Sequence, residues 1–410
     1  MVIKEITIND FKEFLIKNNY NGYRQTLEYA LLKSENNYEY EIIGYCDNND
    51  AIKVAALVLV KIINNSYLYG YIPEGFIADY TDESLIKSFT ADLIKYYKKE
   101  GLSFIKINPR IPIFTINLKT HEKVRTDNSK IITLLNSCGY KKQEEIDDFD
   151  EVLPRVGCIV DLKSYDFNKL EKNTKNKIKR GIRKGLTLEI GNSQQVEILN
   201  KFIKNKINKP TYYYNDLYNI FNREGNVDLF LISIDYNRCL LSSKNAYERE
   251  KAKNDILKYK VSNNPSKKNI NKRLNSDKAL ESYKNDIIIS TKHAADPKEY
   301  IAGALVVKNN NKASIAITGY NKLYNDFAPN YYLFEEIINY YKDDYDFLDL
   351  DGIVSNFSIN SKYHGLNKFK LGYKPDLYEY IGEFDLVING WNYNHLKRKG
   401  ILKKEFNSKS

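Results

Sequence analysis

The sequence predicts an α/β protein with two tandem domains, each a mixed sheet with helices packed on it, and a helical hairpin inserted into the second domain. Three observations support this fold class. The chain has 410 residues, 42% hydrophobic and 28% charged, which is too long for one compact core and too apolar for disorder. The same order of strands and helices occurs in both halves. A long polar helical pattern interrupts the second half.

Apolar segments early in the first half predict three antiparallel strands, followed by a helical pattern and another strand. A short helix then leads to a turn at Gly139 and to further strand. The expected elements are strands 41–44, 52–63 and 66–72, helix 82–100, strand 103–108, helix 131–137 and strand 158–162.

The second half repeats this order, and a turn at Gly372 leads into a final hairpin. Its expected elements are strands 227–235, 300–308 and 313–318, helix 329–342 and strand 346–350. The agreement predicts two copies of one α/β unit. The expected boundaries are a first domain at 1–155, a second domain at 156–239 and 288–395, an arm at 240–287 and a tail at 396–410.

The inserted segment predicts two helices around a turn at 261–268, where Asn-Asn-Pro-Ser breaks any helix. Its apolar residues are sparse, which is typical of an antiparallel hairpin that projects into solvent. Residues 244–286 carry twelve Lys or Arg against six Asp or Glu. The sequence leaves open whether these cations are solvated or contact RNA phosphates.

The net charge of +10 favours polyanionic partners, although scattered lysines also suit an ordinary solvated surface. The longest uninterrupted apolar run, 54–60, is far shorter than the roughly 20 residues of a membrane helix. The first residues lack the apolar core of a signal peptide, so we expect a cytoplasmic protein. Four cysteines without CxxC spacing and four isolated histidines predict neither a metal site nor disulfides.

Residues 365–389, GLNKFKLGYKPDLYEYIGEFDLVIN, combine Phe369-Lys370-Leu371-Gly372 with two alternating apolar segments. This stretch resembles the C-terminal signature of the Fem family, enzymes that transfer an amino acid from aminoacyl-tRNA to the peptide stem of a peptidoglycan precursor. The resemblance runs from residue 25 to 389. It implies two acetyltransferase-like (GNAT-like) domains, in which central strands splay apart to leave a groove for an acyl donor. The helical arm is a feature of the glycine- and serine-adding branch of the family.

The resemblance assigns Lys370 as the cation that stabilises the negative oxygen of the tetrahedral intermediate. Phe369 is expected in a strand with its side chain on the opposite face, as a wall of the substrate site. In IKINPR, Asn108 stands where the family has an aspartate near the acceptor amine. Asparagine is no general base, so Asn108 is expected to orient the amine, and water or the departing ribose hydroxyl is left to take the proton.

Gln25, Tyr29 and Lys33 are four residues apart and so would share one helix face. They resemble a family helix whose lysine binds a phosphate of the precursor. The segment NKPTYYY, 208–214, resembles one that holds the precursor's phosphate and sugar, with Lys209 and Tyr213 at the matching positions. A lysine in place of the family's arginine supplies a point charge instead of a bidentate fork.

Within residues 166–190, eight cations and one glutamate, Glu171, precede the expected strand, which makes phosphate contact plausible. The end of this helix matches the family's Ile-Arg-Lys-x-Gly. As a group, Lys179, Arg180 and Arg183 are the expected tRNA-binding residues.

The resemblance therefore implies an aminoacyltransferase that takes glycine, serine or alanine from aminoacyl-tRNA. Its acceptor would be a lipid-linked or nucleotide-linked muropeptide, without a metal or other cofactor, and with peripheral contact at the inner membrane face. One alternative is a small-molecule N-acyltransferase on the same fold, but the sequence lacks the pyrophosphate loop that acetyl-CoA requires. The other is a non-catalytic basic RNA-binding protein.

Overall fold

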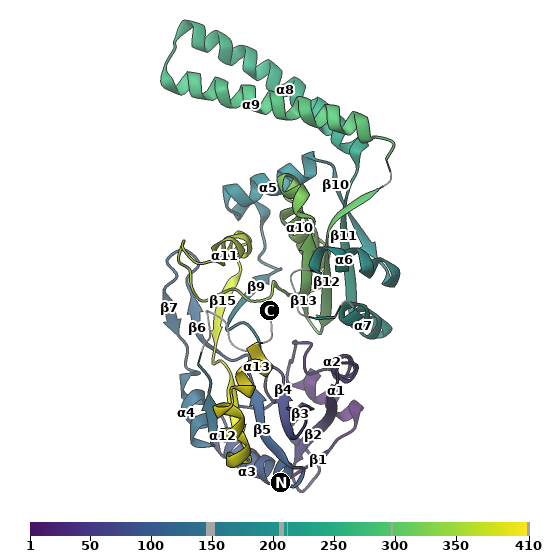
Figure 1. Ribbon diagram of the computed structural model, residues 1–410. Coiled ribbons are helices and arrows are strands. Elements are labelled where there is room, and N and C mark those ends of the chain that lie inside the picture. The colour runs from purple at the N-terminus through teal and green to yellow at the C-terminus, as the bar shows by residue number, and fades with distance from the viewer. Residues whose placement is uncertain (145–151, 205–208, 211, 297, 408–410) are drawn as a thin grey trace.

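Two mixed sheets and a projecting pair of helices make up the computed structural model, which describes residues 1–144, 152–204, 209–210, 212–296 and 298–407 (Figure 1). The sheet orders are β1-β2-β3-β4-β5-β16-β8 and β10-β11-β12-β13-β14-β9-β15-β6-β7. In each, four antiparallel strands lead through a crossover helix to a parallel strand. This is the predicted tandem acetyltransferase-like architecture, which is confirmed.

In the first sheet, the crossover from β4 to the parallel β5 is made by α3 (Glu83–Lys99). Asp82 caps this helix because its side chain accepts from the backbone N–H of Leu85 at 2.9 Å. Helices α1 (Ile8–Lys17), α2 (Leu27–Ser34) and α4 (Ser129–Ser137) complete this half. The strands are β1 (Val2–Glu5), β2 (Glu39–Cys46), β3 (Ile52–Ile63), β4 (Tyr67–Ile72), β5 (Leu102–Ile107), β8 (Tyr140–Lys142) and β16 (Phe384–Val387).

In the second sheet, α10 (Pro329–Tyr341) makes the same crossover from β13 to the parallel β14. The other helices of this half are α5 (Lys172–Arg183), α6 (Val196–Ile203), α7 (Tyr212–Phe221) and α11 (His364–Leu371). The strands are β6 (Pro112–Ile116), β7 (Lys123–Arg125), β9 (Val156–Asp161), β10 (Leu186–Gly191), β11 (Val227–Ile234), β12 (Glu299–Asn309), β13 (Lys312–Tyr320), β14 (Phe347–Asp349) and β15 (Asp376–Tyr380).

The two halves exchange strands. β9, predicted to close the first half, lies between β14 and β15 of the second sheet. β6 and β7, which come before residue 155, extend the same sheet beyond β15. In return β16, from the end of the chain, lies between β5 and β8 of the first sheet. The predicted final hairpin is therefore wrong, because β15 and β16 belong to different sheets. An alternating pattern marks a strand and its buried face, but it does not name the neighbouring strand. We keep the boundaries at 155 and 395 as a proposal for the repeat unit along the chain.

A buried ion cluster anchors β16 to the first sheet. Lys106 of β5 is fully buried, and its Nζ lies 3.0 Å from an oxygen of Asp385 and 3.5 Å from one of Glu383. Glu383 also accepts the backbone N–H groups of Val152 and Leu153 at 2.6 and 3.2 Å. The charges thus join three distant chain segments in a place from which water is excluded.

The arm consists of α8 (Tyr236–Asn263) and α9 (Lys267–His293), which run antiparallel and project from one end of the molecule (Figure 1). It is longer than the predicted 240–287. Polar side chains form part of its seam: Ser276 donates to Glu250 at 2.6 Å, and Asn254 donates to Asp277 at 2.7 Å. Within the described part of the chain, no helix has the length and apolar character required to cross a bilayer.

Replacing Lys106 with Met should destabilise the protein by about 3–5 kcal/mol, because two carboxylates would stay buried without their cation. Urea unfolding followed by circular dichroism measures this loss. Lys98→Met, an exposed change on α3, is the matched control and should alter the free energy of unfolding by no more than about 0.5 kcal/mol. Equal effects of the two changes would contradict an anchoring role for the cluster.

Candidate functional site

Two adjoining cavities lie where the two halves meet. The larger, which we name the Lys370 cavity, has a volume of about 680 Å³. The smaller, the Lys33 cavity, has a volume of about 470 Å³. Their linings share four residues: Pro154, Ala316, Ile317 and Asp351. A ligand in one cavity can therefore reach a ligand in the other across this common wall.

The Lys370 cavity opens where two central strands diverge. β13 and β14 are paired over three residues only, from Lys312 with Phe347 to Ser314 with Asp349. Beyond that point, 315–318 and Tyr320 of β13 line one side of the cavity, and the loop 350–352 after β14 lines the other. This splayed pair is the groove that the acetyltransferase-like fold was predicted to contain.

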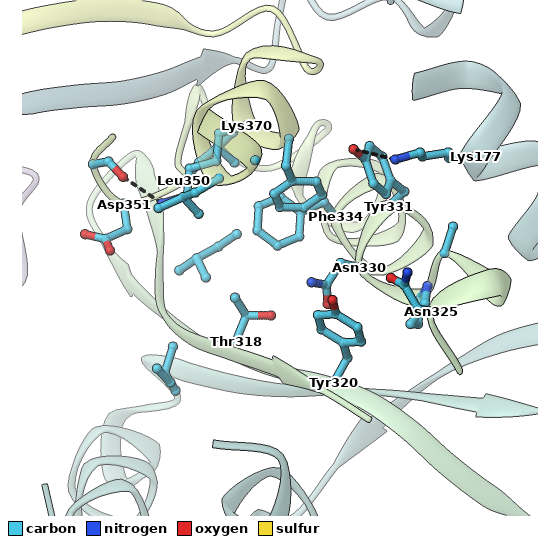
Figure 2. A pocket seen from close by; sticks show the side chains of 18 of the residues that line it. Lys177, Thr318, Tyr320, Asn325, Asn330, Tyr331, Phe334, Leu350, Asp351 and Lys370 are labelled. Atoms are coloured by element: carbon cyan, nitrogen blue, oxygen red, sulfur yellow. Dashed lines mark hydrogen bonds between the residues drawn. The ribbon is translucent and has the colours of Figure 1, made fainter. Parts of the chain in front are cut away.

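Lys370 enters this cavity from α11 and is only 6% exposed (Figure 2). Its Nζ donates to the carbonyl of Gly352 at 2.8 Å, and among the described residues no carboxylate lies within ion-pair distance of it. Asn367, one turn earlier, exchanges hydrogen bonds with the backbone N–H and C=O of Val354 at 3.2 and 3.0 Å. These contacts hold α11 against the loop after β14, so the ammonium group is fixed and retains donors for a ligand.

Phe369 and Lys370 lie in a helix, so the prediction of a strand at this point is wrong. The apolar alternation begins only at β15, after the Gly372 turn. A short apolar segment does not by itself distinguish helix from strand. Phe369 nevertheless forms a wall of the cavity, with ring centroids 4.8 Å from Tyr331 and 4.7 Å from Phe334.

The far side of the Lys370 cavity carries unpartnered polar groups. Figure 2 shows Thr318 of β13 and Asn330 of α10 at the cavity, across from Lys370. The Thr318 hydroxyl and the Asn330 side-chain oxygen are buried without a hydrogen-bond partner among the described residues. Because leaving such groups unsatisfied is costly, they are candidates for ligand contact. Lys177, whose Nζ donates to the Tyr331 hydroxyl at 3.1 Å, and Arg180 add positive charge at the rim.

The Lys33 cavity gathers three cations: Arg24, Lys33 and Lys209. The guanidinium of Arg24 pairs with Glu74 at 2.9 Å. The other two cations lie over aromatic rings, with Nζ of Lys33 5.0 Å from the Tyr38 centroid and Nζ of Lys209 4.4 Å from that of Tyr213. Such a cluster of cations around one hollow suits a multiply charged anion. The sequence-predicted Lys33, Lys209 and Tyr213 are thus brought together.

The cavity lowers the pKa of both lysines. For Lys33, burial lowers the pKa, and the charges of Lys209 and Arg24 add to the effect. For Lys209, removal from water inside the cavity and then the charge of Arg24 lower the pKa to about 8, although one side of the residue remains exposed. A bound anion would reverse these effects by favouring the charged amines.

Two sequence expectations for the first half are corrected. Gln25 does not share a helix face with Lys33, because α2 begins at Leu27 and is capped by Thr26. Instead the buried Gln25 amide bonds the backbone of Leu57, donating to its carbonyl at 3.2 Å and accepting from its N–H at 2.7 Å.

Asn108 lines neither cavity. Its side-chain oxygen accepts the backbone N–H of Glu74 at 2.8 Å, and its amide donates to the Tyr71 hydroxyl at 3.1 Å. Both ends of the amide are therefore engaged within the fold. Glu74 pairs with Arg24, which lines the Lys33 cavity, so Asn108 stabilises that cavity indirectly through Glu74. Asn108 does not line the Lys370 cavity.

The three basic residues predicted as one group on α5 have different surroundings. Arg180 lines the Lys370 cavity. Lys179 lies over the ring of Phe167, with its Nζ 6.0 Å from the centroid. Arg183 is engaged at the base of the arm, where it and Lys184 both donate to the buried Asp286. The guanidinium of Arg183 thus attaches the arm to the body.

The sequence analysis missed several residues that line the cavities, among them Arg24, Thr318 and Asn330, and Asp351 is the one placed between the two cavities. It lies in the wall common to both cavities and is exposed there. Its backbone is left-handed, with φ of 64°, a conformation that aspartate tolerates better than most residues and that is frequent at functional sites. The next residue must be glycine, because a Cβ on Gly352 would lie 2.0 Å from Pro154. The Asp-Gly pair after a strand was the sequence feature from which this position could have been predicted.

This arrangement has the parts required for acyl transfer between two bound molecules. It provides an anion site with three cations, a groove between splayed strands, a buried ammonium group and a carboxylate between them. Lys33 lies on α2, Lys370 on α11 and Asp351 in the loop after β14. No side chain in the described residues forms a cluster of three or more metal-binding groups with its neighbours.

Comparison with known proteins gives a consistent picture. A model described as the FemAB family matches residues 6–398. The aminoacyltransferase FemA of Staphylococcus epidermidis is 25% identical over 440 residues, covering 98% of this chain and 100% of that protein. FemA of Staphylococcus aureus is 24% identical over 425 residues, covering 95% and 96%. The crystal structure of FemX has the same fold, with a TM-score of 0.73 at 19% identity over 97% of this chain and 100% of that one.

Inorganic pyrophosphate should bind the Lys33 cavity and lose affinity as pH rises. Lys209 is charged below its pKa of about 8 and neutral above it, so the affinity should fall up to about tenfold between about pH 7 and pH 9. Isothermal titration calorimetry at each pH measures this change.

Lys209→Arg is the matched variant, because a guanidinium stays charged throughout this range. The step near pH 8 should disappear in this variant, whereas Lys209→Met should bind weakly at every pH. A step of unchanged size in Lys209→Arg would show that another group titrates.

Proposed function

This chain belongs to the FemAB family, and from that premise we propose that it moves an amino acid from aminoacyl-tRNA to the stem-peptide amine of a peptidoglycan precursor. It is an aminoacyltransferase, and formation of the peptidoglycan interpeptide bridge is the process in which this family acts. The tRNA donor and an amino acid of the glycine, serine or alanine class are the further content of the proposal. The pair of adjoining cavities with complementary chemistry is the observation that carries it.

The acceptor is assigned to the Lys33 cavity. Lipid-linked and nucleotide-linked muropeptides both carry a diphosphate, which is the type of anion that Arg24, Lys33 and Lys209 suit. Tyr213 is placed to pack against the adjacent sugar. From this cavity the stem peptide would extend past the common wall, so that its amine reaches Asp351.

The donor is assigned to the Lys370 cavity. Arg180 and Lys177 at its rim suit the phosphates near the aminoacylated end of tRNA. Thr318 and Asn330 offer hydrogen bonds to the terminal nucleoside or to the amino acid. The ester carbonyl would then lie near Lys370, between the splayed strands.

The reaction joins the two ligands across the common wall. The amine nitrogen attacks the ester carbonyl carbon, and the resulting negative oxygen receives a hydrogen bond and positive charge from Lys370. When the carbon–oxygen bond to the ribose breaks, an amide forms and the ribose oxygen takes up a proton. Lys370 is prepositioned by its bond to Gly352, so little reorganisation is required.

Asp351 is assigned as the residue that binds the acceptor amine and takes its proton. Its carboxylate is available in the wall that both ligands approach, where it can accept a hydrogen bond from the amine and take its proton. Asn108 has neither the chemistry nor the location for this step. The proton would pass from Asp351 to the ribose oxygen that leaves.

The family assignment removes the non-catalytic RNA-binding alternative. The acetyl-CoA alternative is tested by the choice of donor in the following experiment.

Transfer of radiolabelled amino acids from a charged total-tRNA pool to muropeptide acceptors should be sensitive to ribonuclease and should fall by at least about tenfold in Lys370→Met, the scale of losing one oxyanion donor. Lys368→Met, on the same helix but exposed, is the matched control and should transfer normally. Labelling from acetyl-CoA, or none with any amino acid despite folded protein, would refute the proposal.

Asp351→Asn should lower the rate of transfer at saturating substrates by about a hundredfold, because it removes the proton acceptor. Binding of both substrates should change little. Asp326→Asn, in the same cavity but not in the common wall, is the control carboxylate and should be nearly neutral. A normal rate in Asp351→Asn would mean that the amine loses its proton elsewhere.

A further inference from the structure

We propose that α12 (Gly390–Arg398) and α13 (Ile401–Asn407) form the surface by which this enzyme docks on an anionic membrane, next to the cavity for its acceptor. We name this surface the Trp391 face and define it by Trp391, His395, Lys397, Arg398, Lys399, Lys403 and Lys404. The inference rests on the proposed function, and its new content is the location of the docking surface.

Helix α12 presents aromatic and basic side chains on its outer side. Trp391 is 70% exposed, and His395, one turn later, stacks on it with ring centroids 5.7 Å apart. Arg398 follows three residues later, on the same side of the helix, and is exposed. The opposite side of the helix, with Tyr393 and Leu396, is buried in the core. The exposure of Trp391 is therefore not required by the packing of the helix.

The charge of the Trp391 face complements an anionic bilayer. Within 390–407 the sequence has five Lys or Arg and one acid, Glu405, which pairs with Lys61 at 2.6 Å. The five cations are all exposed: Lys397, Arg398, Lys399, Lys403 and Lys404. Asn394, Lys397 and Arg398 also line a shallow hollow beside Trp391, which suits an anionic headgroup. Tryptophan next to a basic cluster is typical of membrane interfaces.

The Trp391 face adjoins the Lys33 cavity. Phe104 of β5 contacts both Tyr393 and Phe406, with ring centroids 5.4 and 6.4 Å apart, so the first turn of α12 lies beside the last turn of α13. Glu405 and Phe406 of that last turn line the Lys33 cavity. Lys403 and Lys404 of the Trp391 face directly precede these two lining residues, so the face extends along the chain to the wall of the Lys33 cavity.

An RNA partner is less well supported at this face. The basic residues assigned to tRNA border the Lys370 cavity, and the arm projects from the opposite end of the molecule from α12 (Figure 1). Docking through α12 would leave these surfaces free for tRNA while the acceptor stays at the membrane.

Trp391 is the one tryptophan in the chain, so the fluorescence of the unmodified protein reports on this face directly. Vesicles of phosphatidylcholine with phosphatidylglycerol should shift its emission to shorter wavelength and protect it from acrylamide. Vesicles of phosphatidylcholine alone should do neither, and added salt should reverse the effect. Unchanged emission and quenching with anionic vesicles would overturn the proposal.

Co-sedimentation with the anionic vesicles separates a specific face from net charge. Lys397→Glu with Arg398→Glu should weaken partitioning by more than about tenfold, since each basic residue contributes about fivefold. Lys267→Glu with Lys268→Glu, at the exposed tip of the arm, makes the same change in net charge and should have a much smaller effect. Equal losses would overturn the proposal. Protection of Trp391 by tRNA without vesicles would also overturn it, in favour of RNA.

Activity assays keep this inference distinct from the proposed function. Trp391→Ala should transfer normally to a nucleotide-linked precursor in solution but several-fold more slowly to a lipid-linked precursor in anionic vesicles. If Trp391→Ala retained the same fraction of the unmodified protein's rate on both acceptors, the docking role would be overturned. Failure of the unmodified protein to transfer to either acceptor would refute the proposed function instead, whereas the fluorescence result would still report on docking.

Discussion

The reciprocal exchange of β6 and β7 for β16 is the constraint on which the rest of the structure depends. Each sheet includes strand from the other half of the chain, so neither half has all its backbone hydrogen bonds alone. The buried Lys106 cluster fixes one of these exchanged strands. Because the sheets are interlocked in this way, the segments between them have a defined position, and the cavities can be built from both halves.

The site follows from that interlock. Pro154, two residues before β9, lies in the wall that both cavities share and packs against Gly352. The divergence of β13 from β14 opens the Lys370 cavity on one side of this wall. On the other side, first-half residues such as Lys33 meet second-half residues such as Lys209. Two substrates can therefore be held in different cavities and still meet at Asp351.

Electrostatics shape the two cavities differently. In the Lys33 cavity three cations lie close together, and burial together with the charge of Arg24 lowers the pKa of Lys209. The charged form of Lys209 is therefore destabilised until an anion binds. In the Lys370 cavity a buried ammonium group is held by a backbone carbonyl, so its position is set before a ligand arrives. The Lys33 cavity therefore suits recognition of a charged group. The Lys370 cavity suits stabilisation of a charge that develops during a reaction.

By itself, the sequence determined the order of strands and helices and the arm, because periodicity and turns are written in neighbouring residues. Its local motifs also proposed Lys33, Lys209 and Lys370 as site residues. Only the tertiary structure decided which strands pair, that Phe369 and Lys370 lie on a helix, that Asn108 and Gln25 serve the fold, and that Arg183 secures the arm. The tertiary structure also placed Asp351 in the wall common to both cavities. Each of these depends on contacts between segments far apart in the chain, and local pattern carries no information about such partners.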